Sequence, residues 1–94
     1  MLIRELLHQD EARSIRLSVW KDGRGNLVMH LQELQREGDG VETYMMFNSW
    51  SPTVAREACT RATAKAVLGF YNAHIETARE LVRARVASLQ EVAS

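Results

Sequence analysis

The stretch that decides the fold is residues 52–94, PTVAREACTRATAKAVLGFYNAHIETARELVRARVASLQEVAS. After Pro52 it contains no further proline and a single glycine, Gly69, within a run of strong helix formers. Ser51 can accept an amide hydrogen of a first helical turn, and a proline just after it has a φ that suits a helix. The stretch therefore predicts a long helix over residues 52–92, about 60 Å in length at ~1.5 Å per residue.

A polar stripe indicates that this helix continues through Gly69. At about 100° of rotation per residue, polar side chains on both sides of the glycine share one face of the helix. The alternative is a kink near Gly69 or Asn72, and a glycine costs a helix interior only about 1 kcal/mol. The stripe consists of Arg61, Lys65, Asn72, Glu76, Arg79 and Arg83.

Before this helix, apolar residues alternate with polar ones. A period of two predicts half-buried strands, and it recurs over residues 13–21, 27–34 and 41–48. Glycine-rich turns separate the three segments, so an antiparallel meander is the simplest arrangement. At the start of the chain, residues 2–12 place Leu2, Ile3, Leu6 and Leu7 at helical spacing, which predicts a short N-terminal helix.

These elements predict a single α+β domain over residues 1–94. It consists of the short N-terminal helix, a three-stranded antiparallel meander and the long C-terminal helix packed on one face of the sheet. We expect the first half of the long helix to approach the sheet through three alanines, because small side chains allow close packing. They are Ala58, Ala62 and Ala66.

The composition of the chain limits the partners and the cellular compartment that we expect. Twelve basic and twelve acidic side chains cancel, so no strong overall field attracts nucleic acid or an anionic membrane. A single cysteine, Cys59, excludes an internal disulfide. The apolar start of the chain is short and interrupted by charges, unlike a secretion signal or a membrane span. We therefore expect a cytoplasmic protein.

No group of side chains has the spacing of a catalytic or metal site. On a continuous helix Cys59 and His74 lie about 22 Å apart, too far for a nucleophile and its base. His8, His30 and His74 fall in three different elements, and none has a second ligand at metal-binding spacing. The sequence therefore predicts neither an enzyme nor a bound metal or cofactor.

The second half of the long helix carries an apolar stripe that the short strands leave uncovered. Strands of eight or nine residues span only about 30 Å. We expect the stripe to pack against a second copy and form a homodimer; the alternative is that it folds back on the N-terminal helix. The dimerisation residues are Ile75, Ala78, Val82, Val86 and Leu89.

A second candidate surface is the face of the sheet turned away from the long helix. Aromatic residues, methionine and arginine are enriched where proteins bind proteins. The alternative is that the N-terminal helix covers this face. The candidate partner-binding residues are Arg16, Trp20, His30, Tyr44 and Met46.

Two functions fit these features. The first is a non-catalytic protein–protein interaction module, a homodimeric small inhibitor or adaptor, for which a phage or plasmid setting like that of anti-CRISPR proteins is plausible. The second is nucleic-acid binding. The order helix, three strands, helix resembles the double-stranded RNA-binding domain over residues 2–72, and residues 55–68 resemble its second helix. That family has lysines where this chain has Pro52-Thr53-Val54, so only Arg56, Arg61 and Lys65 would contact phosphates.

Overall fold

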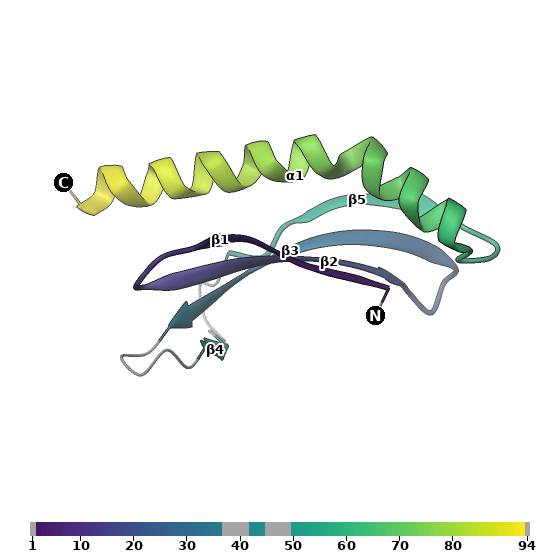
Figure 1. The fold of residues 1–94 in the computed structure, drawn as a ribbon, viewed down its shortest axis with the longest axis horizontal. Helices are drawn as coiled ribbons and strands as arrows, with labels where there is room; N and C mark the ends of the chain where they lie inside the picture. The colour runs from purple at the N-terminus through teal and green to yellow at the C-terminus, as the bar shows by residue number, and fades with distance from the viewer. Residues whose placement is uncertain (1, 37–41, 45–49, 94) are drawn as a thin grey trace.

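The computed structural model describes residues 2–36, 42–44 and 50–93. They form an α+β fold in which one long helix lies over one face of an antiparallel sheet (Figure 1). The elements in chain order are β1 (Ile3–Gln9), β2 (Arg13–Lys21), β3 (Asn26–Arg36), β4 (Glu42–Tyr44), β5 (Thr53–Ala58) and α1 (Ala64–Ala93).

Strand β3 organises the sheet. One edge of β3 pairs with β2 from Leu27 to Gln35, and β2 pairs in turn with β1. The other edge is shared: β5 pairs with the first half of β3, and β4 pairs with its last three residues. The sheet is therefore four strands wide, with β4 and β5 occupying the same edge at different heights.

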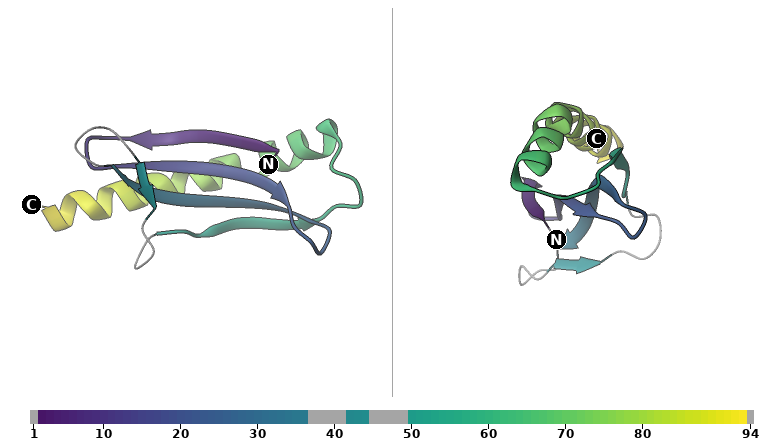
Figure 2. Two further views of the ribbon diagram at one scale, coloured as in Figure 1. Left: turned by 90° about the horizontal axis from the view of Figure 1, so that it is seen from below. Right: turned by 90° about the vertical axis from the view of Figure 1, so that its right-hand side faces the viewer.

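The core lies between the sheet and α1. Alternate residues of β2 and β3 point toward the helix, because antiparallel partners share a face and successive side chains alternate. The sheet curves around the helix, which crosses the strands at an angle (Figure 2). The buried core residues are Ile15, Leu17 and Val19 of β2, Leu27, Met29 and Leu31 of β3, and Val67, Phe70, Ile75, Ala78 and Val82 of α1.

The predicted N-terminal helix over residues 2–12 is wrong, since residues 3–9 form the edge strand β1. Apolar residues on both faces of the strand explain the error. Ile3 and Leu7 pack against the core, whereas Leu6 lies opposite Arg16 on the other face and is 42% exposed. Because both faces of the strand carry leucine or isoleucine, the apolar residues follow the spacing of a helical face.

The predicted start of the long helix at Pro52 is also wrong. Residues 53–58 form β5, and α1 begins at Ala64. Thr63 caps the helix, because its Oγ1 accepts a hydrogen bond from the amide of Ala66 at 3.2 Å. Ala58 consequently lies exposed in β5 instead of packing a helix on the sheet.

Other predictions agree with the structure. Residues 13–21 form β2, and the predicted strand over residues 27–34 lies within β3. The predicted third strand, residues 41–48, is found as β4 over residues 42–44; residues 41 and 45–48 lie outside the described residues. Helix α1 runs through Gly69 without interruption, and its polar stripe from Asn72 to Arg83 is exposed.

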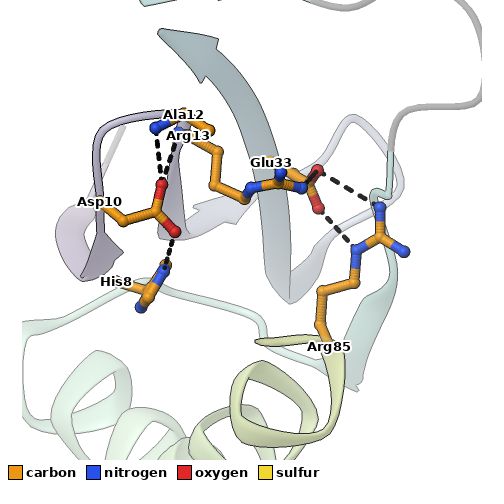
Figure 3. A network of polar contacts seen from close by, with 6 residues as sticks. All are labelled: His8, Asp10, Ala12, Arg13, Glu33 and Arg85. Atoms are coloured by element: carbon orange, nitrogen blue, oxygen red, sulfur yellow. Dashed lines mark hydrogen bonds and ion pairs between the residues drawn. The ribbon is translucent and has the colours of Figure 1, made fainter. Parts of the chain in front are cut away.

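An ion-pair cluster fastens the second half of α1 to the sheet (Figure 3). Arg85 donates to Glu33 at 2.7 Å, and Arg13 of β2 donates to the same carboxylate at 3.2 Å. The guanidinium of Arg85 also lies 6.0 Å from the centre of the Trp50 ring. Glu33 is only 12% exposed, so removing its charge leaves two arginines partly buried without their counter-ion.

We expect Glu33→Gln to lower the free energy of unfolding by about 1–3 kcal/mol, because each arginine loses a charge-assisted hydrogen bond. Urea unfolding followed by circular dichroism measures the change. Glu76→Gln is the control, since the exposed Glu76–Arg79 pair should contribute less than about 1 kcal/mol. Equal effects of the two substitutions would contradict the role assigned to Glu33.

Gly69→Ala should raise the free energy of unfolding by about 1 kcal/mol, because glycine is the poorer helix former. A Cβ at position 69 meets no atom within 4 Å, so no clash offsets this gain. Urea unfolding again measures it. Destabilisation would show that the helix needs glycine at this position.

Candidate binding surface

The face of the sheet turned away from α1 is called the outer face. The strand register places its residues in rows, because residues paired across antiparallel strands project from the same side. One row joins Trp20, Val28 and Arg56, and the next joins Arg4, Ser18 and His30. A third row contains Leu6, Arg16 and Gln32.

Large apolar side chains are exposed on this face. Leu6 is 42% exposed and Trp20 is 37% exposed. Val28, the row neighbour of Trp20, is 1% exposed, although it points away from the helix and lies outside the main core cluster. Exposed aromatic and aliphatic side chains beside a buried apolar residue are typical of a binding surface.

Charge is divided between the two sides of the sheet. Three strand carboxylates lie on the helix side: Glu5 accepts from the Tyr71 hydroxyl, Glu33 from two arginines, and Glu57 lies 3.9 Å from His74. Glu42 of β4 is placed only by its backbone, opposite Arg36. Strand arginines on the outer face come from β1, β2, β3 and β5. They are Arg4, Arg16, Arg36 and Arg56.

The turn between β2 and β3 fixes one end of the outer face. Asp22 accepts hydrogen bonds from the amides of Arg24 and Asn26, each at 2.9 Å, and Gly25 adopts a φ of 81°. These hydrogen bonds, led by that of Asn26, lower the pKa of Asp22. The charged carboxylate then lies 3.9 Å from the guanidinium of Arg56.

His30 lies at the centre of the outer face. Its Nε2 is hydrogen-bonded to the Ser51 hydroxyl at 2.7 Å, which joins β3 to the segment before β5. Burial lowers the pKa of His30 below the ordinary histidine value of 6.5. The imidazole is therefore neutral at pH 7, and it contributes hydrogen bonding and not charge to the surface.

The structure brings together three of the five predicted partner-binding residues. Arg16, Trp20 and His30 share the outer face, whereas Tyr44 is placed only by its backbone, opposite Leu34 at the end of β3. Met46 lies outside the described residues. The alternative, in which an N-terminal helix covers this face, is wrong, because residues 3–9 form β1.

Three members of this surface lie where the sequence predicts helices. They are Arg4 and Leu6 of β1 and Arg56 of β5. The signal that could have found Arg56 is the β-branched pair Thr53-Val54 directly after a proline, which favours a strand over a helix.

The predicted dimerisation stripe lies against the sheet of its own chain and not on the surface. Ile75, Ala78 and Val82 are buried in the core of the same chain, and Val86 packs against that core. A dimer joined through these residues would require the helix to leave its own sheet, so the stripe is not the exposed surface that the prediction assumed. The predicted alternative partner, an N-terminal helix, is also wrong. The homodimer itself stays a prediction.

The cysteine and the histidines contact different residues. The Cys59 thiol donates to the carbonyl of Arg61 at 3.0 Å, and His74 stacks edge-on against Phe70 with ring centres 4.9 Å apart. Cys59 precedes α1, so the sequence argument that placed both residues on one helix is wrong. Among the described residues, no three His, Cys, Asp or Glu side chains cluster where they could hold a metal ion.

No helix within the described ranges combines the length and apolar character needed to cross a membrane. Comparison with protein families, with curated proteins and with solved structures finds no match to this chain. The function therefore has to be argued from the surface itself.

Stability should fall in the wild type as the pH drops below about 6.5, and less so in His30→Gln. The unfolded chain binds a proton near its ordinary pKa of 6.5, whereas the folded imidazole resists protonation, so acid favours unfolding. Urea unfolding at pH 7.5 and 5.5 measures this difference. Between pH 7.5 and 8.5 the stability gap between the two proteins should stay constant, and an equal loss of stability at pH 5.5 would contradict the assignment.

Proposed function

We propose that this protein is a non-catalytic protein-binding module that uses the outer face. The observation that carries the proposal is a sheet face with exposed Trp20 and Leu6 beside arginines, over which no described helix lies. Tryptophan and arginine are the side chains that most often dominate the energy of protein interfaces. The surface sits on hydrogen-bonded strands, so little conformational entropy is lost when a partner binds.

The distribution of charge favours an acidic partner. On the described part of the outer face, the arginines of β1, β2 and β5 flank the apolar residues, while the carboxylates of Glu5, Glu33 and Glu57 face the helix. A carboxylate-bearing partner would gain charge-assisted hydrogen bonds at the rim of an apolar contact. A small inhibitor or adaptor acts in this way, by occupying a site on a larger protein. A phage or plasmid setting and a homodimeric state belong to this proposal.

Nucleic-acid binding is the second candidate. The resemblance to the double-stranded RNA-binding domain loses its basis, because neither of the two helix segments it required is helical at residues 2–12 and 53–58. A specific observation still favours single strands: Trp20 offers a ring for base stacking on a face that also carries Arg4 and Arg56. Such binding would depend steeply on salt.

Trp20→Ala should weaken partner binding by about 2 kcal/mol, roughly 30-fold in Kd. Partners are captured from the native host on immobilised wild type, identified by mass spectrometry, and titrated by calorimetry against both proteins. Leu68→Ala is the control, because Leu68 is 55% exposed on α1, away from the outer face. Equal affinities of wild type and Trp20→Ala for the captured partner would refute the proposal.

Fluorescence anisotropy with a labelled 20-nucleotide single strand distinguishes the second candidate. A few phosphate contacts should weaken binding roughly tenfold or more between 50 and 200 mM salt. A decrease of this size would favour nucleic acid. Circular dichroism of each variant verifies that the fold is retained.

A further inference from the structure

A groove opens between the end of β5 and the first half of α1. The helix crosses the strands at an angle, close to Trp50 through Arg85 and farther from β5 near its own first turns (Figure 2). This divergence leaves a hollow of about 460 Å³ over the buried side chains of Leu27 and Phe70. Its helical wall is made of small residues, Ala66, Gly69 and Ala73.

The strand beside this groove has an open edge. Within the described residues β5 pairs with β3 alone. The amide of Cys59 donates to the carbonyl of Gly25, and Glu57 lies opposite Leu27, so these residues direct their backbone groups toward β3. Antiparallel strands alternate the direction of these groups, so the backbone groups of Arg56 and Ala58 point to the open edge.

The groove lies beside β5, next to the open edge of this strand. A strand added along β5 would project alternate side chains toward the helix, into the space above Leu27 and Phe70. Backbone hydrogen bonds and a side-chain pocket are the two components that bind an extended peptide to a sheet edge.

We propose that the β5 edge and its groove bind an extended segment of a partner protein as an additional strand. The segment carries apolar side chains at alternate positions, which fill the groove, and a carboxylate that reaches Lys65. This surface is separate from the outer face, so the inference goes beyond the proposed function.

Charge supports the carboxylate. Lys65 lines the mouth of the groove in the first turn of α1, and that turn contains no acidic residue. The positive end of the helix dipole and the ammonium therefore act together on an anion at this position. Across the groove, Glu57 lies 3.9 Å from His74, so the partner's carboxylate has its favourable position on the helix side.

A second copy of the chain fits this groove poorly. If β5 paired with β5 of a second molecule, the residues facing the helix would be Ala55 and Glu57. An alanine leaves most of the hollow empty, and the second copy's carboxylate would enter a groove that is already lined by Glu57, a like charge. A foreign segment with larger apolar side chains is the better occupant.

The test is selection from a phage-displayed library of random twelve-residue peptides on the immobilised protein. Enriched peptides should alternate apolar with polar residues and contain an acidic residue near one end. Labelled copies of these peptides are then titrated by fluorescence anisotropy against wild type and variants.

Gly69→Leu should weaken peptide binding at least tenfold by filling the groove, and Gly69→Ala is its matched control with a smaller side chain. Ala58→Pro should weaken binding similarly, because it removes an outward amide without breaking the pairing with β3. Lys65→Glu, an exposed change that leaves the core intact, should weaken it several-fold. Trp20→Ala should have no effect.

Several results would overturn the inference. They are a selection without enrichment, enriched peptides that lack the alternation, and affinities unchanged by Gly69→Leu, Ala58→Pro and Lys65→Glu. Loss of peptide binding in Trp20→Ala alone would assign the peptides to the outer face. Light scattering gives a further result that would overturn it. If the wild type is a dimer and Ala58→Pro is a monomer, a second copy of the chain occupies the edge of β5.

Discussion

The rest of the structure depends on the pairing of β3 along both of its edges. Eleven residues of β3 carry backbone donors and acceptors that need partners once the strand is buried under α1. β2 satisfies one edge along its length, whereas the other edge is completed by two separate segments, β4 and β5. Residues 53–58 are extended because β3 requires a partner there, despite a composition that suits a helix.

This arrangement also decides where the helix lies. With β5 in the sheet, α1 keeps thirty residues and packs its apolar stripe along its own sheet, with Ile75, Ala78 and Val82 in the core. The Glu33 cluster holds the second half of α1 close to Trp50. The first half diverges from β5, so the groove and the open strand edge arise from the same geometry.

The helix side of the sheet contributes to stability, and the outer face is the proposed recognition surface. Carboxylates on the helix side pair with groups of α1 or β2, and they join the helix to the strands. The outer face has Trp20 and Leu6 exposed among arginines, and the overall neutrality of the chain conceals this division. Net charge measured over a whole chain is therefore a poor guide to the field of one face.

The sequence by itself determined the strands whose alternation is regular, residues 13–21 and 27–34, and the unbroken helix through Gly69. It also identified Arg16, Trp20 and His30 as one face, because a period of two assigns faces without knowledge of neighbours. Only the tertiary structure decided that residues 3–9 and 53–58 are strands. Their local patterns are ambiguous, one because apolar residues lie on both faces and the other because of its alanines, and pairing with β2 and β3 resolved them. Arg4 and Leu6 reach the outer face only through that pairing, because the local pattern of residues 2–12 is that of a helix. For Arg56 the local signal is the β-branched pair Thr53-Val54 after Pro52.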